Sequence, residues 1–282
     1  MELRSEHAEI FAPDGLPADQ ALARTTHLGI SAHQDDLEIM AVDGILSCFQ
    51  RPDRWFTGVI VTDGAGSARN GLYADYTDDQ MKVIRIQEQK KAAIIGDYAA
   101  AVLLGYTSGQ VKSSAHPEPV EDLRKIIAQC RPEVIYTHNL ADKHPTHVAV
   151  VTRVIQALRG MPKEYHPQRF YGCEVWRDLG WTLDDDKIVF DCSEHDNLQN
   201  ALVSVFDSQV AGGKRYDLAT MGRRRANATY YASHGVDTAT GLAYGMDLSP
   251  LLADPSLDIP AYIQSYIDRF SQDVRQLLSQ VQ

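Results

Sequence analysis

The sequence lacks any apolar run of the roughly 20 residues needed to cross a bilayer. Its first 21 residues are mixed and acidic and contain no apolar stretch typical of a signal peptide. Cysteine is scarce, and no CxxC pair occurs among Cys48, Cys130, Cys173 and Cys192. We therefore expect free, buried thiols in a reducing compartment and a cytoplasmic protein without a membrane span.

Basic residues are also in short supply, with 27 Lys and Arg against 38 Asp and Glu, for a formal net charge of -11. Binding to nucleic acid through its phosphates needs clustered cations, so this class of function is excluded. The one basic cluster, Arg223-Arg224-Arg225, lies in a helix-like segment and is interpreted as a solvated or salt-bridged face. Nothing in the sequence decides the oligomeric state, and a homo-oligomer stays open.

A GxGxxG fingerprint is absent after the first predicted strand, which argues against a dinucleotide site. What is present is an ordinary globular composition, with 44% hydrophobic and 23% charged residues over 282 positions. A chain of this length can bury a large core.

Apolar runs alternate with amphipathic segments from residue 27 onward. The runs predict strands at residues 27–32, 55–62, 99–104 and 133–137. The amphipathic segments predict helices at residues 37–49, 78–95, 120–130 and 145–158. This alternation indicates an α/β fold with a Rossmann-like, mostly parallel sheet flanked by helices.

The two ends of the chain are less regular. Residues 1–26 read as an irregular N-terminal arm, and residues 27–282 as a single domain. In the C-terminal part we expect an irregular α+β region that helps to shape the pocket. Its predicted elements are strands at 170–176 and 187–190 and helices at 197–206, 214–226 and 261–278.

Two short motifs place metal-binding side chains where a strand gives way to a helix: Ala32-His33-Gln34-Asp35-Asp36 and His144-Pro145-Thr146-His147. Ligands bind at the carboxyl ends of parallel strands, so both motifs are expected at one edge of the sheet. Imidazoles with adjacent carboxylates suit a catalytic zinc site that has three protein ligands, an open position for water and a spare carboxylate as base.

The spacing indicates how the motifs divide this work. His33 and Asp36 flank a turn and can reach one ion, and His147 on the first turn of its helix can complete the set. Asp35 is then free to take a proton from water, and His144 lies near the substrate carbonyl.

Each motif also has a purely structural interpretation. Asp35 with Glu38 fits a helix capping box. His144 could cap a helix that has Pro145 at its first position, which would leave His147 exposed. Capping alone does not explain two such motifs after strands of the same sheet, so we favour the metal site.

The two motifs together resemble the LmbE-like, or PIG-L, deacetylases, which remove acyl groups from N-acyl glucosamine units. The family's motifs read Ala-His-Pro-Asp-Asp and His-Pro-Asp-His. The similarity runs from about His27 to Leu158 and includes Thr62-Asp63-Gly64, Arg69, and Arg85 with Glu88. It continues weakly into Glu174-Val175-Trp176 and Ser208-Gln209.

The resemblance implies a Zn²⁺ ion, or another divalent transition metal, bound by His33, Asp36 and His147. It implies Asp35 as general base and later general acid, and His144 as the group that stabilises the oxyanion. Arg69 is implied as a substrate-binding residue, and we group Asp63 and Asp142 with it.

Two positions depart from the family pattern. Gln34 replaces the usual proline, which removes no ligand, and Thr146 replaces the usual aspartate beside His144. Without that carboxylate, His144 is expected to be neutral more often, unless Asp142 takes over its role.

The sequence thus predicts a zinc-dependent hydrolase that removes an acyl group, most simply acetyl, from a small N-acylated amino sugar or its conjugate. One alternative is a metallohydrolase of the same fold that acts on another amide or ester. The other is a sugar-binding relative without catalytic activity.

Overall fold

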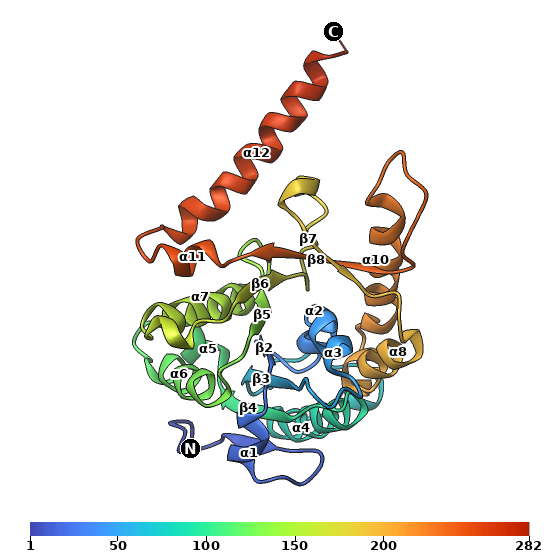
Figure 1. Ribbon diagram of the computed structural model, residues 1–282. Coiled ribbons are helices and arrows are strands. Elements are labelled where there is room, and N and C mark those ends of the chain that lie inside the picture. Colours follow the sequence, from blue (N-terminus) through green and yellow to red (C-terminus); the bar gives the residue numbers. More distant parts are fainter. Residues whose placement is uncertain (282) are drawn as a thin grey trace.

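The computed structural model describes residues 1–281 and contains one eight-stranded sheet with helices on both faces (Figure 1). The strands are β1 Glu9–Phe11, β2 His27–Ser31, β3 Phe56–Thr62, β4 Ala100–Tyr106, β5 Val134–His138, β6 Arg169–Cys173, β7 Ile188–Asp191 and β8 Leu242–Asp247. Their order in the sheet is β1-β4-β3-β2-β5-β6-β8-β7. The predicted α/β class, with a mostly parallel sheet flanked by helices, is confirmed.

The middle of the sheet is parallel and its edges are antiparallel. Strands β4, β3, β2, β5 and β6 pair in parallel, while β1 pairs antiparallel with β4, and β8 pairs antiparallel with both β6 and β7. The chain runs from β2 outward to β4 in one direction and from β5 to β6 in the other. The order therefore reverses between β2 and β5, which is where open α/β sheets bind their ligands.

Two layers of helices cover the sheet, and each encloses its own hydrophobic core. One layer contains α1 Ala18–Ala23, α5 Ser108–Lys112, α6 Glu118–Cys130 and α7 Pro145–Arg159. The other contains α2 Asp36–Met40, α3 Val42–Cys48, α4 Asp78–Ile95 and α8 Asp196–Ser204. The remaining helices are α9 Asp207–Val210, α10 Tyr216–Tyr230, α11 Pro250–Ala253 and α12 Ile259–Ser279.

The apolar strands of the sequence are continuous because both faces of each strand are buried. In β3, Val59 belongs to one core and the adjacent Ile60 to the other. The same alternation assigns Val102 and Leu103 of β4 to opposite cores. Strands buried on both faces have no polar side to show, so their sequences contain apolar runs without alternation.

Several elements were not anticipated. The N-terminal arm contributes the edge strand β1 and helix α1, and the C-terminal region contributes β8 to the same sheet. The helix expected at residues 37–49 is divided at Ala41 into α2 and α3. Short edge strands have few residues in which to display a pattern, which is why β1 escaped prediction.

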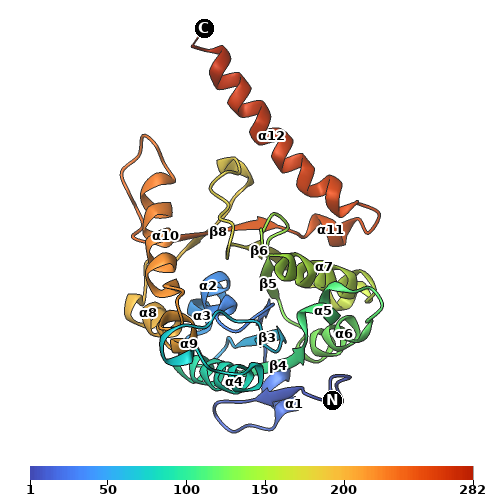
Figure 2. The same ribbon diagram turned by 180° about the vertical axis from the view of Figure 1, so that it is seen from behind.

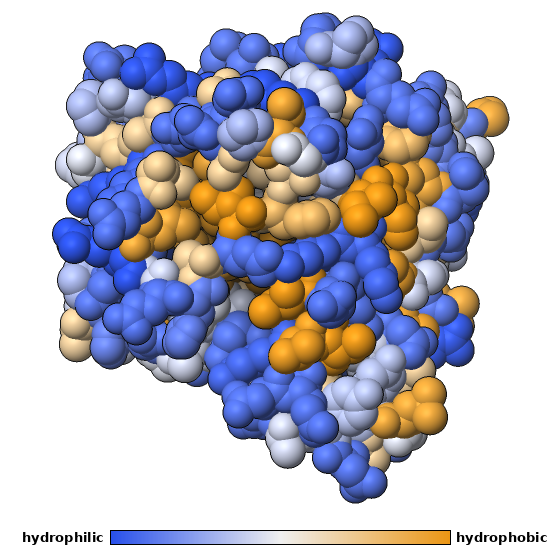
Figure 3. Space-filling view, turned by 90° about the horizontal axis from the view of Figure 1, so that it is seen from below, coloured by the Kyte–Doolittle hydropathy of each residue, from blue (hydrophilic) through white to orange (hydrophobic). Residues whose placement is uncertain are grey.

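On the face seen from below, apolar residues appear in patches between polar side chains (Figure 3). Helix α12 projects from the body of the molecule in both ribbon views (Figures 1 and 2). No helix within residues 1–281 has the length and apolarity needed to cross a membrane. All four cysteines are buried and free, as expected.

Candidate active site

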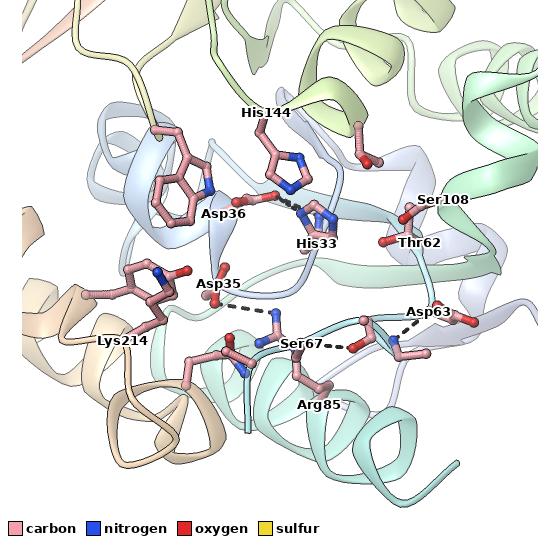
Figure 4. Close-up of a pocket in the computed structure, with 18 of the residues that line it drawn as sticks. His33, Asp35, Asp36, Thr62, Asp63, Ser67, Arg85, Ser108, His144 and Lys214 are labelled. Atoms are coloured by element: carbon pink, nitrogen blue, oxygen red, sulfur yellow. Dashed lines mark hydrogen bonds and ion pairs between the residues drawn. The ribbon is translucent and has the colours of Figure 1, made fainter. Parts of the chain in front are cut away.

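The candidate site lies where the strand order reverses, in a cavity of about 430 Å³ at the carboxyl ends of the strands (Figure 4). His33, Asp35 and Asp36 follow β2, and His144 and Thr146 stand at the start of α7. The loop after β3 forms a third wall, from Asp63 to Ala68. Gly64 has φ +73°, and an added Cβ there would lie 2.4 Å from Oε1 of Gln34, so this wall requires glycine. The sheet thus brings both sequence motifs to one cavity.

Three donor atoms lie at nearly equal distances from one another in this cavity. His33 Nδ1 is 3.2 Å from Asp36 Oδ2 and 3.2 Å from His147 Nε2. His147 Nε2 is 3.3 Å from Asp36 Oδ2. In a tetrahedral zinc site with ligand distances of ~2.0–2.1 Å, the donor atoms lie ~3.3–3.4 Å apart. The three side chains named from the sequence therefore fit one face of a tetrahedral metal site.

Two further groups fix the orientation of these donors. The backbone N–H of His33 donates to Asp36 Oδ2 at 2.7 Å, which directs this carboxylate inward. On the far side of His147, Nδ1 faces Asp142 Oδ2 at 3.4 Å. A carboxylate behind a histidine fixes the tautomer that leaves Nε2 free to bind a metal.

His138, the last residue of β5, is fully buried beside these donors. Its ring stacks on His147, with centroids 3.9 Å apart. Its Nε2 accepts the backbone N–H of Ala32 at 2.8 Å, so that lone pair is already used. His138 therefore supports the site by packing, although it also lies within reach of Asp36.

The carboxylate and the imidazoles of this cluster shift one another's pKa values. Burial opposes ionisation of Asp36, but the imidazoles of His147, His33 and His138 hold its pKa well below the ordinary value. Burial likewise disfavours the charged form of His147, yet the carboxylates of Asp36 and Asp142 raise its pKa. A buried carboxylate that stays ionised among imidazoles is a donor set compatible with a divalent transition metal.

Asp35 differs from Asp36 in backbone and surroundings. Its φ is 80°, in a region that residues other than glycine rarely adopt, and its side chain makes no capping hydrogen bond. The capping interpretation is therefore wrong for this residue. Asp35 Oδ2 lies 3.4 Å from the buried Arg85 guanidinium. Burial and the nearby carboxylates of Asp36 and Glu38 raise the pKa of Asp35 to about 8, although Arg85 opposes the shift.

His144 lines the cavity on the opposite side from Asp35 (Figure 4). Its ring centroid is 5.0 Å from that of His33 and 4.6 Å from that of His147. Burial and the neighbouring imidazoles lower the pKa of His144 to about 4. The ring is therefore neutral near pH 7, and it can donate one N–H bond.

Of the three residues predicted to bind substrate, only Asp63 lines the cavity. Arg69 does not line it, because its guanidinium binds the Ala65 carbonyl and pairs with Asp78. Asp142 is buried behind His147 and binds the backbone N–H groups of His144 and Trp176 instead. The suggestion that Asp142 replaces the missing partner of the His144 ring is thus not met.

Other cavity residues were not identified as site residues from the sequence: Arg85, Ser108, Lys112, Trp176, Gln209, Lys214 and Tyr216. Arg85, Trp176 and Gln209 had appeared in the family resemblance, but no local pattern marked their role. The others come from segments whose position depends on tertiary packing.

Comparison with known proteins matches the region of both motifs to a protein family. The profile of the family described as PIG-L, GlcNAc-PI de-N-acetylase, matches residues 28–158, which include both motifs. Residues 28–158 are a PIG-L family domain. The resemblance inferred from the motifs is confirmed over these residues, and the family match supports the prediction of a deacetylase enzyme. No curated protein matches the chain by sequence.

Solved structures share the fold around the PIG-L domain. N,N'-diacetylchitobiose deacetylase from Pyrococcus horikoshii matches with a TM-score of 0.60 and 16% identity, over 78% of this chain and 83% of that one. A conserved protein of Thermus thermophilus matches with a TM-score of 0.60 and 17% identity, over 83% and 99%. The 4-carboxy-2-hydroxymuconate hydratase of Pseudomonas putida matches with a TM-score of 0.59 and 16% identity, over 79% and 96%. At these identities the likeness establishes the fold alone, and the fold carries both a deacetylase and a hydratase.

Proposed function

We propose that this protein is a metal-dependent deacetylase that hydrolyses the acyl amide of an N-acylated amino sugar or its conjugate. The observation that carries the proposal is the triangle of His33 Nδ1, Asp36 Oδ2 and His147 Nε2, with sides of 3.2, 3.2 and 3.3 Å. These residues would bind the ion, and Zn²⁺ suits the two nitrogens and one oxygen best. Membership of the PIG-L family and the diacetylchitobiose deacetylase among the similar structures support the sugar substrate.

A bound divalent ion supplies Lewis acidity, which polarises the acyl carbonyl and lowers the pKa of water. Asp35 takes a proton from the attacking water as its oxygen bonds to the acyl carbon. Asp35 then delivers that proton to the amide nitrogen as the C–N bond breaks, which yields a carboxylic acid and a free amine; the acid then ionises, and its proton passes to the amine or to water. The raised pKa of Asp35 suits a group that must both accept and return a proton near neutral pH.

His144 lies across the cavity from Asp35 and would donate its ring N–H to the oxyanion that forms on the acyl oxygen. Its ring packs over Trp176, with centroids 6.4 Å apart, which limits its freedom to turn. A donor held in place before the reaction costs little reorganisation during it.

The test is a metal and turnover assay on the full chain. Protein purified without chelators is expected to contain about one divalent ion per chain and to release amine from N-acetylglucosamine derivatives. Chelation should abolish release, and added Zn²⁺ should restore it. His147→Ala is expected to lose both metal and turnover.

An assay for hydration of unsaturated carboxylic acids separates the two reactions known in this fold. Hydration without amine release would contradict the deacetylase and favour hydratase chemistry. Binding of amino sugars by metal-free protein with no turnover of any kind would favour a non-catalytic sugar-binding protein.

A further inference from the structure

Two buried N–H donors on the cavity wall have no acceptor within residues 1–281. They are the NH1 group of Arg85 and Nε2 of Gln209. Arg85 is only 2% exposed and Gln209 only 4%. The other guanidinium nitrogens of Arg85 are engaged with Gln34 and Asp35, so NH1 alone is left over. Buried donors without acceptors destabilise the folded protein, and a ligand oxygen would satisfy them.

Two hydrogen bonds from Ser208 to Glu88 hold the segments that carry Arg85 and Gln209 side by side in the cavity wall. Glu88 lies one turn beyond Arg85 on α4, and its two carboxylate oxygens accept the N–H and the hydroxyl of Ser208 at 2.7 and 2.6 Å. Gln209 follows Ser208 directly, so the segment that carries it is anchored beside Arg85. The buried Glu88 thereby gives the wall a fixed geometry.

A cation completes this wall. The backbone N–H of Lys214 donates to the Gln209 carbonyl at 2.8 Å, which closes the turn between the two residues. Its ammonium lies 4.9 Å from the centroid of the Trp176 ring and has no ion-pair partner in the part of the chain that the structure describes. In Figure 4 the Lys214 side chain reaches toward the cavity from the side opposite Asp63.

The charge of the cavity favours an anion. Asp35 faces Arg85 at 3.4 Å and Asp63 faces Lys82 at 3.5 Å, so both carboxylates are balanced. Lys112 and Lys214 line the cavity as well, against one further carboxylate, that of the proposed ligand Asp36. A bound divalent ion would add positive charge, so the cavity would attract anions although the chain as a whole carries a net charge of -11.

We propose that Arg85, Gln209 and Lys214 form a subsite for an anionic, oxygen-bearing group of the substrate, either a carboxylate or a phosphate. This inference rests on the proposed function, because it places the anion in the same cavity as the acyl amide. Guanidinium, amide and ammonium groups are all donors, and charge-assisted hydrogen bonds to an anion are the strong ones.

The kinetic test compares three substrates: neutral N-acetylglucosamine, its 6-phosphate, and the carboxylate-bearing N-acetylmuramic acid. At least one anionic substrate is expected to exceed the neutral one by about tenfold or more in kcat/KM, which corresponds to ~1.4 kcal/mol. Whichever anion is preferred distinguishes phosphate from carboxylate. Lys214→Gln should lower the ratio of anionic to neutral kcat/KM several-fold.

Lys143→Gln is the matched control. Lys143 lies 5.5 Å from the same Trp176 ring but does not line the cavity, so its substitution should leave the ratio unchanged. Equal ratios in wild type and Lys214→Gln, or an equal fall in Lys143→Gln, would overturn the subsite.

A binding arm separates this inference from the proposed function. Calorimetry with glucosamine and glucosamine 6-phosphate needs no turnover. If the phosphate binds more tightly, and Lys214→Gln removes the difference, the subsite stands even when no substrate releases amine, and only the deacetylase proposal fails. If amine is released but neither rate nor affinity depends on the anion, the subsite is wrong and the deacetylase stands.

Helix α12 carries a separate feature, an apolar stripe that packs against the core at Ile263 and that nothing in residues 1–281 buries beyond this residue. The helix extends away from the body (Figures 1 and 2), and Tyr266 is its one buried residue. Arg269 pairs with Asp186 at 2.8 Å near its base. Beyond this point the stripe is exposed, from 39% at Phe270 and Val274 to 56% at Leu277.

The spacing of this stripe is that of a helix–helix seam. Its members alternate at intervals of four and three residues, which is the heptad pattern of coiled coils. They are Ile263, Ile267, Phe270, Val274, Leu277 and, just past the helix, Val281. A helix packed on a protein surface shows the same intervals, but here the body of the molecule lies only beside the base of α12, so a second helix with the same repeat suits the outer part of the stripe.

The charge of α12 distinguishes between a membrane surface and a second helix as the partner of this stripe. Two aspartates and two arginines make the helix neutral: Asp268, Arg269, Asp273 and Arg275. Helices that bind membrane surfaces carry an excess of Lys and Arg on the polar face, which α12 lacks. Two neutral copies can approach each other without repulsion, although the chain has a net charge of -11.

We infer that α12 pairs with α12 of a second copy of this chain. One symmetric contact covers the stripe on both copies and closes the assembly as a dimer. The stripe spans fewer than the three or four heptads of independent coiled coils, so we expect a dissociation constant in the micromolar range.

Sedimentation of the full chain over a range of concentrations tests this inference. Wild type is expected to change from monomer to dimer in the micromolar range, and Val274→Asp with Leu277→Asp should remain monomeric with unchanged melting temperature. Gln272→Asp and Gln276→Asp, off the stripe, form the matched control and should still dimerise. A wild type that stays monomeric at hundreds of micromolar, a dimer that survives the stripe substitutions, or tight binding of the monomer to vesicles with 30% anionic lipid would overturn the inference.

Discussion

Asp35 and Asp36 are neighbours in the sequence but lie in different surroundings. Asp36 faces three imidazoles, whereas Asp35 turns through a positive φ toward Arg85. The backbone at Asp35 therefore separates two carboxylates that would otherwise compete for the same ion. This separation is the residue-scale basis for assigning one to the metal and the other to proton transfer.

Asp35→Asn tests that assignment. The amide keeps the shape of the side chain but cannot accept a proton, so turnover is expected to fall by about 10²–10⁴-fold while metal content is retained. Metal analysis and amine release on the same preparation provide the measurement. A parallel loss of metal would mean that Asp35 is itself a ligand.

Asp142→Asn addresses the group behind His147. Because Asp142 Oδ2 faces His147 Nδ1 at 3.4 Å, its loss should weaken metal binding by about 10–100-fold. Competition with a chelator of known affinity measures the change. Asp63→Asn is the control, since Asp63 lines the cavity without contacting His147, and metal affinity there should change by less than about twofold. Equal effects in both variants would speak against an orienting role for Asp142.

At the scale of elements, a buried carboxylate on α6 ties the N-terminal arm to the sheet. Asp122 Oδ1 accepts the N–H of Arg4 at 2.7 Å, and Oδ2 accepts the N–H of Ser5 at 3.1 Å and the hydroxyl of Tyr106 at 2.6 Å. The arm therefore takes part in the folded structure beyond the short pairing of β1 with β4.

Asp122→Ala leaves these donors buried without an acceptor, so we expect a loss of about 2–4 kcal/mol in the free energy of unfolding. Urea denaturation measures it. Glu121→Ala is the control, because Glu121 pairs with Arg4 at the surface and exposed pairs contribute less than about 1 kcal/mol. If both substitutions cost the same, the buried contacts of Asp122 do not stabilise the arm.

His27, the first residue of β2, makes the free energy of unfolding depend on pH. Burial, with smaller contributions from Arg54 and Arg169, lowers the pKa of His27 to about 4, so the folded protein binds this proton less readily than the unfolded chain. The contribution of the neutral His27 ring to the free energy of unfolding is fully present above the pKa of the unfolded chain, ~6.5, and is lost as the pH falls toward 4.

We expect His27→Gln to reduce this dependence. Between pH 7.5 and 5 the wild type should lose about 2 kcal/mol that the variant keeps. Urea titrations of both proteins at each pH give the difference. A difference that stays constant across this range would show that His27 does not titrate as its burial implies.

For the whole molecule, the proposed metal links the two halves of the sheet. His33 and Asp36 follow β2, His147 belongs to the helix after β5, and the strand order reverses between these strands. A ligand that binds only the folded state stabilises it by about 2.7 kcal/mol at 100 times its dissociation constant. Removal of the metal should therefore lower the melting temperature by about 5–10 °C.

Differential scanning calorimetry before and after chelation measures this shift, and re-addition of Zn²⁺ should reverse it. His147→Ala supplies the control, because its melting temperature should not respond to either treatment. A wild type with the same insensitivity would argue against a resident metal.

The sequence alone determined the fold class and the two motifs, because strand periodicity and ligand spacing are local properties of the chain. His33, Asp36 and His147 could be named together since each follows a strand that ends at the same edge of the sheet. The long central helices and strands were located for the same reason, as their patterns repeat over many residues.

Tertiary structure alone decided which polar residues reach the cavity. Arg69 follows the right strand but turns to Asp78, whereas Arg85, Gln209 and Lys214 enter from a helix and a distant turn. Asp142 lies behind His147 and does not line the cavity. Such placements depend on how α4, α9 and the loops pack against one another, and no short-range pattern in the chain encodes that packing.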